Sequence, residues 1–455
     1  MPVSQEELDQ LIETIFSEIK QYKDENATVH PYDIADQLLE LRDINKDEYF
    51  NVLKKIPHEL FADILSEMPE HIQEEITDLF STKKIADIAS RMDTDDVASF
   101  IQTLSEENKE VAQTILETFD HEDKEIIEQL LAYDDEEAGS YMQTELFSAQ
   151  INDNIGDAIK NLKALKEAGE IDNIWHAHIV DENKHYLGSV GLEELIIFEH
   201  NLKFSDIPSD KYRNYFVNHK MDIQDVVEMV TNYNLTSIPV VDDNNKLIGR
   251  ITADDIVDII QETATEQLYH LAGVDDEAEQ EEDMFEIGKT RAIWLGLNLI
   301  TAIAASLVIG FFDSTIQSLV ALAVLMPIVA SMGGNAGTQT LTVTVRQMAL
   351  GDIESEDAKK TIYKEVIISL ANGLLFAVTI GIVSYVWFHI PLLGVVIALS
   401  MIINLLSAGF FGSVIPLLLQ KANIDPAIGS TVLLTTVTDV VGFFSFLGLA
   451  KLILL

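Results

Sequence analysis

Five apolar stretches in the last third of the chain set the strongest constraint on its fold. A helix needs about 20 predominantly apolar residues to cross the roughly 30 Å hydrocarbon core of a bilayer. The stretches that meet this length cover residues 292–312, 316–338, 362–388, 392–419 and 427–453. The sequence therefore predicts a five-span α-helical membrane domain over residues 289–455.

Basic residues beside these stretches predict the orientation of the domain, because cytoplasmic loops are enriched in lysine and arginine. Lys289 and Arg291 precede the first stretch, further basic residues lie between the second and third, and Lys421 lies between the fourth and fifth. The loops at residues 313–314 and 389–391 contain no lysine or arginine. We expect a multi-pass protein of the cell membrane with a cytoplasmic N-terminus and an extracytoplasmic C-terminus.

The last apolar stretch contains one acidic residue near its middle, Asp439. A carboxylate at that depth costs about 2.5–3.5 kcal/mol on insertion scales, so such a group normally faces a bundle interior or a water-filled path. On a helix, Thr435 lies one turn earlier on the same face, and hard cations prefer oxygen ligands. We interpret this face as part of an ion pathway. The alternative is a buried aspartate paired with a basic residue of another span.

The second stretch contains the sequence PIVASMGGNAGTQ from Pro327 to Gln339. Pro327 removes a backbone donor and the glycines weaken a helix, so we expect irregular backbone here. Irregular backbone at membrane depth is tolerated only inside protein or beside water. Asn335 and the freed carbonyl groups would then line the same path as Asp439. A glycine-rich surface for helix packing is the alternative.

The charge of the chain lies almost entirely before the membrane domain. The formal net charge is −47, yet the residues from Arg291 onward include eight acidic and seven basic side chains. Such an acidic surface argues against a nucleic-acid partner and favours cations.

The chain has no cysteine, which excludes disulfides and thiolate metal sites. The acidic, amphipathic N-terminus has no basic segment leading into an apolar core, so we expect no secretory signal.

Residues 1–140 show apolar positions at helical spacing throughout, and we predict a superhelical domain of stacked helix pairs. Helix start signals occur at Pro57 and at residues 93–96, 105–107 and 121–123. Asp95 and Asp96 fall at one of these starts. Acidic residues there favour the helix dipole, so capping is one interpretation, and a cation site with partners from elsewhere in the fold is the other.

Residues 141–260 contain one pattern twice: a strand, a short turn, a second strand and a helix. The second copy, at residues 237–260, includes the run Ile-Pro-Val-Val-Asp and a Thr-x-x-Asp ending at Thr252 and Asp255. The two copies resemble a tandem pair of CBS domains, at residues 141–203 and 204–260. That resemblance implies that Thr252 and Asp255 contact a nucleotide ribose, whereas Gly191 stands at the position of Thr252 in the first copy. A purely structural regulatory module is the alternative.

Residues 261–288 join the soluble part to the membrane domain. A helical apolar pattern continues to Leu271 and is followed by an acidic run that begins at Asp275. Such runs are usually solvated linkers. Because this one directly precedes the first span, we also consider Asp275 a candidate ligand of a connector that responds to cations.

The chain resembles the MgtE-type magnesium channel family over nearly its whole length. The most specific marks of this resemblance are the motifs PIVASMGGNAGTQ and TTVTDVVG, the latter containing Asp439. The resemblance implies a homodimer with a central pore in which Asp439 of both subunits holds hydrated Mg²⁺. It also implies that the cytosolic domains sense Mg²⁺, that Asp425 couples the pore to the connecting helix, and that ATP binds the CBS pair.

We therefore predict a multi-domain protein with an all-α superhelical N-domain, α/β tandem CBS domains, a connecting helix and a five-span transmembrane domain. The expected function is a magnesium channel that cytosolic Mg²⁺ closes, not an enzyme, although Co²⁺, Ni²⁺ and Mn²⁺ also accept oxygen ligands.

One alternative is a carrier coupled to protons or sodium, with Asp439 as the titrating group. An intramembrane aspartyl hydrolase would need two carboxylates that share a proton, and only Asp439 lies at mid-depth. A metalloprotease would need an H-E-x-x-H motif, which the sequence lacks.

Overall fold

The contacts of the chain divide it into two compact units, Met1–Ile260 and Gln261–Leu455. The computed structural model describes residues 4–22, 29–73, 75–171, 173–274, 284–349, 353, 358–422 and 424–455. Each unit has hydrophobic cores of its own. The predicted acidic run begins at Asp275, and residues 275–283 lie outside the described residues.

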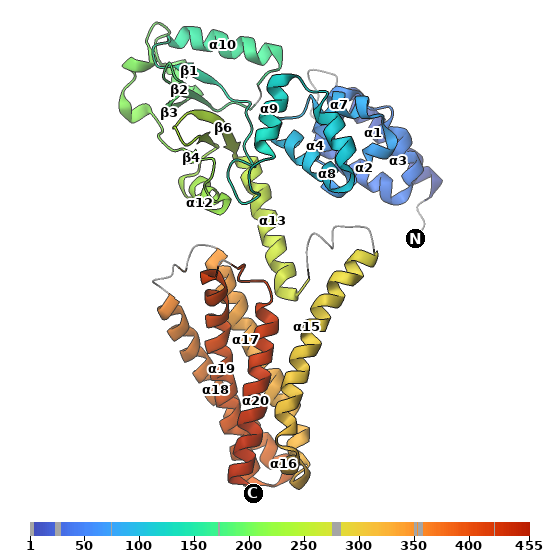
Figure 1. Cartoon of the computed structure of the whole chain (residues 1–455), viewed down its shortest axis with the longest axis vertical. Coiled ribbons are helices and arrows are strands. Elements are labelled where there is room, and N and C mark those ends of the chain that lie inside the picture. The colour runs from blue at the N-terminus through green and yellow to red at the C-terminus, as the bar shows by residue number, and fades with distance from the viewer. Residues whose placement is uncertain are drawn as a thin grey trace. The chain divides into compact units, whose positions relative to one another are not determined.

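The first part of the soluble unit is helical, as predicted (Figure 1). Its helices are α1 (Gln5–Tyr22), α2 (Pro31–Ile44), α3 (Lys46–Leu53), α4 (His58–Ser66), α5 (Glu70–Gln73), α6 (Ile76–Leu79), α7 (Thr82–Ala89), α8 (Thr94–Leu116) and α9 (His121–Leu130). One hydrophobic core joins them, and the apolar positions at helical spacing, such as Leu60, Ile64 and Phe100, are almost completely buried in it.

Local sequence signals determine where most of these helices begin. Pro57 directly precedes α4, and the Asp120 side chain caps α9 by accepting hydrogen bonds from two backbone N–H groups. The predicted start at residues 105–107 lies just before the observed break in α8. The break lies at Asn108, which has φ −146° and ψ 82°, and its side chain accepts from the N–H of Val111 at 3.2 Å. The second half of α8 is therefore capped by this asparagine.

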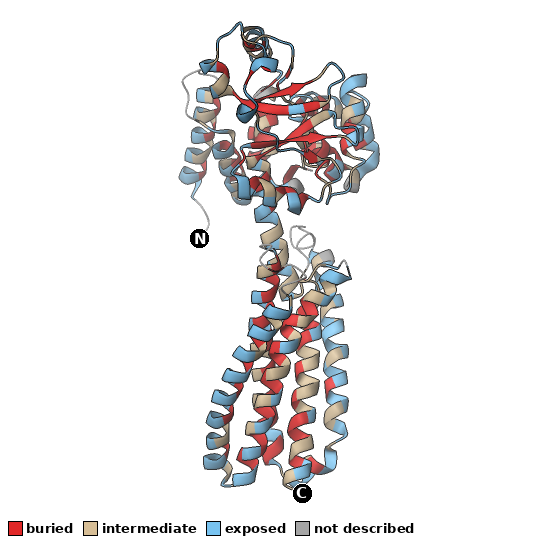
Figure 2. Cartoon of the chain, turned by 90° about the vertical axis from the view of Figure 1, so that its left-hand side faces the viewer, coloured by how far each residue is buried: buried red, intermediate tan, exposed pale blue. Residues whose placement is uncertain are grey.

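The two CBS-like copies form two three-stranded sheets of the same design. In each sheet the first strand pairs parallel with the second, and the second pairs antiparallel with the third. The strands are β1 (Ser148–Gln150), β2 (His176–Val180) and β3 (Tyr186–Gly191), then β4 (Val217–Asn218), β5 (Ser237–Val241) and β6 (Leu247–Thr252). Both central strands, β2 and β5, are buried along their whole length, as Figure 2 shows for the interior of these sheets. The two strands predicted in each copy are confirmed as β2–β3 and β5–β6, whereas the parallel strands β1 and β4 were not predicted.

Helices and short turns complete the two copies. They are α10 (Ile155–Ala168), α11 (Leu192–Ile197), two 3₁₀ turns η1 (Phe204–Asp206) and η2 (Ser209–Lys211), and α12 (Ile223–Tyr233). The hairpin turns of the copies pair with each other, since the N–H of Tyr186 donates to the Asn245 carbonyl at 2.9 Å and the N–H of Leu247 donates to the Lys184 carbonyl at 3.1 Å.

Helix α13 (Ala253–Ala272) is continuous across the domain boundary that we placed at residue 260. The sequence between these ends contains neither glycine nor proline, so nothing interrupts the helical pattern. The predicted connecting helix is therefore the C-terminal half of a helix that begins at the end of strand β6.

Five of the described helices are long and apolar enough to cross a membrane, as predicted. The helices of this unit are α15 (Met284–Gly310), the short α16 (Asp313–Ser318), α17 (Ala321–Ala349), α18 (Ala358–Phe388), α19 (Pro391–Lys421) and α20 (Ser430–Ile453). Helix α19 is the most buried of the five spans, and α15, which packs against α20, is the least buried.

The irregular backbone expected after Pro327 is not observed, because α17 is a continuous helix through it. The glycines serve helix packing instead. A Cβ atom on Gly333 would lie 2.2 Å from the Asn404 amide nitrogen, and one on Gly337 would lie 3.0 Å from Leu434. Gly333 and Gly337 therefore belong to a glycine-rich surface for helix packing, which was the alternative interpretation of this stretch.

Candidate functional site

Helix α17 carries a polar face that no other part of the described chain covers. Ser331, Asn335, Thr338 and Thr342 recur at helical spacing and are exposed, whereas Gly333 lies on the opposite, buried side. The Asn335 amide donates only a long hydrogen bond, of 3.4 Å, to the Ser331 hydroxyl of the same helix. Polar side chains in a membrane span normally face water or other protein rather than lipid.

Helix α20 carries Asp439, whose side chain is half-buried. Within the described residues it makes no hydrogen bond or ion pair, so the alternative of an aspartate neutralised by a basic residue is not what the structure shows. The Thr435 hydroxyl donates to the carbonyl groups of Thr431 at 2.9 Å and Val432 at 3.1 Å. Its oxygen retains lone pairs with which it can accept from a water molecule.

The structure thus brings Thr435 and Asp439 onto one helix face and places Asn335 on the neighbouring helix α17. No hydrogen bond joins Asn335 to either of them among the described residues. A single chain therefore presents the predicted oxygen groups but does not close them into one site.

Asn404 of α19 is a buried polar residue that sequence reasoning missed. Its side chain is fully buried, and its amide nitrogen donates to the Val329 carbonyl of α17 at 2.8 Å. The same side chain packs against Gly333 of α17 and Gly442 of α20, where an added Cβ would lie 2.2 and 2.8 Å from its nitrogen. It therefore holds together the two helices that carry the polar groups. An asparagine in the middle of an apolar span was the signal that could have identified it.

Glu365 of α18 is a second carboxylate that the sequence reading left out, because it lies near the beginning of its helix. It is 6% exposed, and one of its oxygens accepts from the Thr340 hydroxyl of α17 at 3.3 Å. This pair links α17 to α18 next to the close contact between Gly409 and Ser369.

The soluble unit contains an acidic cluster where the first turn of α8 meets the first turn of α13. Burial, followed by the charges of Asp96 and Asp255, raises the pKa of Asp95 well above its usual range. Burial also raises the pKa of Asp96. Burial raises the pKa of Asp255 to about 6, with further contributions from Asp254 and Asp96. Three carboxylates that are predicted ligands therefore lie together and destabilise one another's charged forms.

Among the residues that the structure describes, the cluster has one nearby buried cation, Arg250 of β6. Its guanidinium donates to the Gln143 side chain at 2.7 Å, and Gln143 in turn donates to Asp95 at 3.4 Å. Since one arginine faces several carboxylates, the cluster keeps an excess of negative charge. The N-cap of α8 is Asp93, and Asp95 lies in the first turn, where it accepts the Asp96 N–H at 3.0 Å. This local bond does not remove the excess charge.

Thr252 and Asp255 of the Thr-x-x-Asp ending are hydrogen-bonded to each other. The Asp255 carboxylate accepts the backbone N–H of Thr252 at 3.0 Å, which is one half of a helix capping box, and it also accepts the Thr252 hydroxyl. A ribose hydroxyl at this position would have to share the Asp255 carboxylate with Thr252.

Asp425 lies in the loop before α20, against the end of α13. One of its oxygens accepts the N–H of Ala427 at 2.9 Å, and the other lies 2.8 Å from His270 Nδ1. The connecting helix therefore contacts the loop that leads into the helix of Asp439.

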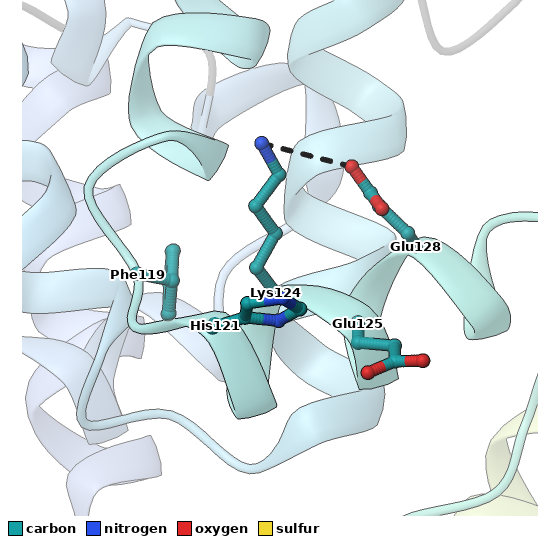
Figure 3. A pocket seen from close by; sticks show the side chains of 5 residues that line it. All are labelled: Phe119, His121, Lys124, Glu125 and Glu128. Carbon is teal, nitrogen blue, oxygen red and sulfur yellow. Dashed lines mark ion pairs between the residues drawn. The ribbon is translucent and has the colours of Figure 1, made fainter.

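A cavity of about 520 Å³ on the N-domain, shown in Figure 3, is lined by none of the residues predicted to bind an ion or a nucleotide. Its lining is Phe119, His121, Lys124, Glu125 and Glu128, and Lys124 pairs with Glu128 at 3.7 Å. These mostly exposed side chains form no buried polar group that points to a ligand.

The raised pKa values predict the pH dependence of stability in the metal-free protein. A carboxylate whose pKa is higher in the folded than in the unfolded state contributes stability that is complete below the unfolded value near 4 and is lost as pH rises through the folded value. Without divalent cations, the soluble unit should lose about 2–3 kcal/mol from Asp255 between pH 4 and pH 6. The variant Asp255→Asn should reduce this loss in thermal unfolding with a chelator present. Replacing the exposed Asp36 of α2 by asparagine should leave the pH profile unchanged, and equal profiles for wild type and Asp255→Asn would contradict the cluster.

A helical N-domain, a CBS pair and a five-span bundle with an uncovered polar face define a multi-pass membrane protein with a large soluble part. Family models described as divalent cation transporter, MgtE intracellular N domain and CBS domain match residues 326–449, 29–136 and 205–262. The magnesium transporter MgtE of Enterococcus faecalis is 32% identical over 320 residues, which cover 70% of each chain. The chain belongs to the MgtE family.

Other relatives align over almost the whole chain. The magnesium transporter MgtE of Thermus thermophilus is 28% identical over 429 residues, or 94% of this chain and 93% of that protein. A crystal structure of the cytosolic domain of the Mg²⁺ channel MgtE in complex with ATP covers 56% of this chain and 98% of its own, with 23% identity and a TM-score of 0.48.

Proposed function

We propose that the protein is a Mg²⁺ channel of the cell membrane that cytosolic Mg²⁺ closes. Membership of the MgtE family and relatives named magnesium transporters support the transported ion. The observation that carries the proposal is the polar surface of the bundle, where Asp439 has no neutralising partner among the described residues and the polar face of α17 lies uncovered.

A second copy of the chain completes the pore in this proposal. Two-fold symmetry would place the Asp439 side chains opposite each other, with Thr435 and Asn335 beside them. Mg²⁺ gives up its water reluctantly and is commonly held through one or two carboxylates with several waters retained. Two facing aspartates surrounded by hydroxyl and amide groups suit such a hydrated ion.

The orientation follows from the positive-inside rule. The spans that the structure shows keep Lys421 and Arg346 at the same ends of the bundle as the start of α15, and the opposite loops carry no lysine or arginine. The N-terminus and the acidic cluster therefore lie in the cytoplasm, and the C-terminus lies outside.

The acidic cluster is the magnesium sensor in this proposal. Asp95, Asp96 and Asp255 belong to two helices, and their repulsion opposes the close approach of these helices. A divalent cation between them relieves that repulsion and favours the compact arrangement, whereas its loss allows the helices to separate. A ligand that binds one of two states more tightly shifts the population toward that state. Because Asp255 is in the first turn of α13, whose other end contacts Asp425, this helix is the element that transmits the change.

Flux into liposomes distinguishes this channel from a carrier coupled to protons or sodium. We expect Mg²⁺ uptake that follows the magnesium gradient and the membrane potential alone, measured with a magnesium-sensitive dye. Uptake that stops when the proton and sodium gradients are removed would contradict a channel and support the carrier.

A further inference from the structure

The side chain of Asn404 of α19 is inserted between two other spans. A Cβ atom on Gly333 of α17 or on Gly442 of α20 would overlap its amide group, so both glycines leave room for it. Its amide nitrogen donates to the Val329 carbonyl of α17 at 2.8 Å. Among the described residues, no other side chain of α19 hydrogen-bonds another helix, since the two serines of α19 that donate do so to carbonyl groups of α19 itself.

This hydrogen bond meets α17 at the weakest part of the helix. Pro327 has no backbone N–H, so α17 lacks the hydrogen bond that residue 327 would otherwise donate. Gly333 and Gly334 have low helix propensity. Val329 lies between them and Pro327, and α19 is the most buried of the five spans. Asn404 therefore attaches the stretch of α17 that bends most easily to the span with the most extensive packing.

The polar groups assigned to the ion pathway lie close to these contacts. Ser331 and Asn335 are two residues before and two residues after Gly333, on the exposed side of α17. Asp439 is about one turn before Gly442 on α20. Mg²⁺ demands near-ideal octahedral geometry and retains several waters, so the oxygen groups that contact the hydrated ion must be placed at fixed separations. A shift of α17 or α20 around the amide group changes those separations.

We propose that Asn404 is a positioning residue of the ion pathway. It touches no ion, because its side chain is completely buried, and it acts by fixing the polar face of α17 relative to Asp439. This assignment rests on the proposed function, which takes that face and Asp439 as the groups that contact Mg²⁺. Stability alone does not account for the side chain. Its amide oxygen has no hydrogen-bond partner among the described residues, and a buried acceptor without a donor is destabilising.

Two substitutions separate positioning from packing. Asn404→Ala leaves a cavity, and Gly333→Ala inserts a methyl group into the space that the amide occupies, so each alone should lower the unfolding temperature of the full-length protein in detergent. In the double variant the added methyl group fills part of the cavity, and the unfolding temperature should lie above that of Asn404→Ala. The matched control is Ser400→Ala. Ser400 is completely buried one turn earlier on α19, and within the described chain its hydroxyl donates only to the Val396 carbonyl of the same helix.

Mg²⁺ uptake by liposomes at a series of Mg²⁺ concentrations measures the positioning role. KM should rise about tenfold in Asn404→Ala and in the double variant, the effect of one net hydrogen bond, while the maximal rate per folded protein changes less. Ser400→Ala should retain the wild-type KM. Where Asn404→Ala fails to fold, the double variant measures the same effect. A wild-type KM in the double variant would overturn the role, since packing alone would then explain any defect of Asn404→Ala.

Backbone hydrogen exchange in detergent tests the attachment of α17 without transport. The amides of residues 328–334 should exchange at least about tenfold faster in the double variant than in wild type or in Ser400→Ala. Equal exchange in wild type and the double variant would overturn the attachment. Wild-type protein that takes up no Mg²⁺, although these amides exchange faster in the double variant, would contradict the proposed function and still support Asn404 as the residue that fixes α17.

Discussion

Asp439→Asn should reduce Mg²⁺ flux by about two orders of magnitude while leaving the protein folded. A carboxylate at this depth costs about 2.5–3.5 kcal/mol, and we expect interaction with the permeating ion to offset that cost. Removing the charge removes this interaction, and about 2.7 kcal/mol corresponds to roughly a hundredfold change in ion binding. Asparagine has nearly the same shape, and Asp439 makes no hydrogen bond among the described residues that the change would break. The measurement is initial Mg²⁺ uptake by liposomes with equal amounts of each protein.

The control for this prediction is an acidic residue of the same unit outside the spans. Asp313 begins the short helix α16, and its carboxylate accepts only a local hydrogen bond from Gln317 within the described chain. Asp313→Asn should retain close to wild-type uptake. Wild-type uptake in Asp439→Asn would refute the assignment of Asp439 to the ion pathway.

Neutralising the acidic cluster with Asp95→Asn, Asp96→Asn and Asp255→Asn together should leave a channel that conducts but no longer closes when cytosolic Mg²⁺ rises. Changing a closed-to-open ratio from 99:1 to 1:99 requires about 5.5 kcal/mol of differential binding. The raised pKa of Asp255 corresponds to about 3 kcal/mol at most, so one carboxylate is insufficient. We therefore expect Asp255→Asn alone to shift the magnesium concentration of half-closure by about tenfold, and the triple variant to abolish closure.

Flux at a series of magnesium concentrations on the cytosolic side measures this effect. The matched control neutralises three exposed acids away from the cluster, Asp36, Asp153 and Asp210, which removes the same charge and should leave closure intact. Loss of closure in both variants would show that total charge matters rather than the cluster, and normal closure in the triple variant would place the sensor elsewhere.

Periodicity and turn signals predicted the elements of this fold well, because those signals are local. The apolar runs predicted the number of spans, and the repeated strand–turn–strand pattern predicted the pairs β2–β3 and β5–β6 but not the third strands β1 and β4. Errors occurred where a local signal competes with its surroundings. Pro327 and the glycines after it predicted irregular backbone, but the close packing of Gly333 on Asn404 compensates for their low helix propensity.

The candidate sites were predicted as single residues rather than as groups. Asp95 and Asp255 are 160 positions apart in the sequence, and only the fold shows that their charges interact. Asn404 could have been singled out as a polar residue within an apolar run, but its contact with another helix could not be predicted. Glu365 was left out because it lies near the beginning of its helix. The contact of His270 with Asp425 was missed because the two residues lie far apart in the sequence.

Single-channel recording of the protein in a planar bilayer, with cytosolic Mg²⁺ varied, is the most direct test of a Mg²⁺ channel that cytosolic Mg²⁺ closes. We expect discrete Mg²⁺ currents whose open probability falls as cytosolic Mg²⁺ rises, and which Asp439→Asn removes. Currents of unchanged size in Asp439→Asn, or an open probability that does not respond to cytosolic Mg²⁺, would contradict it.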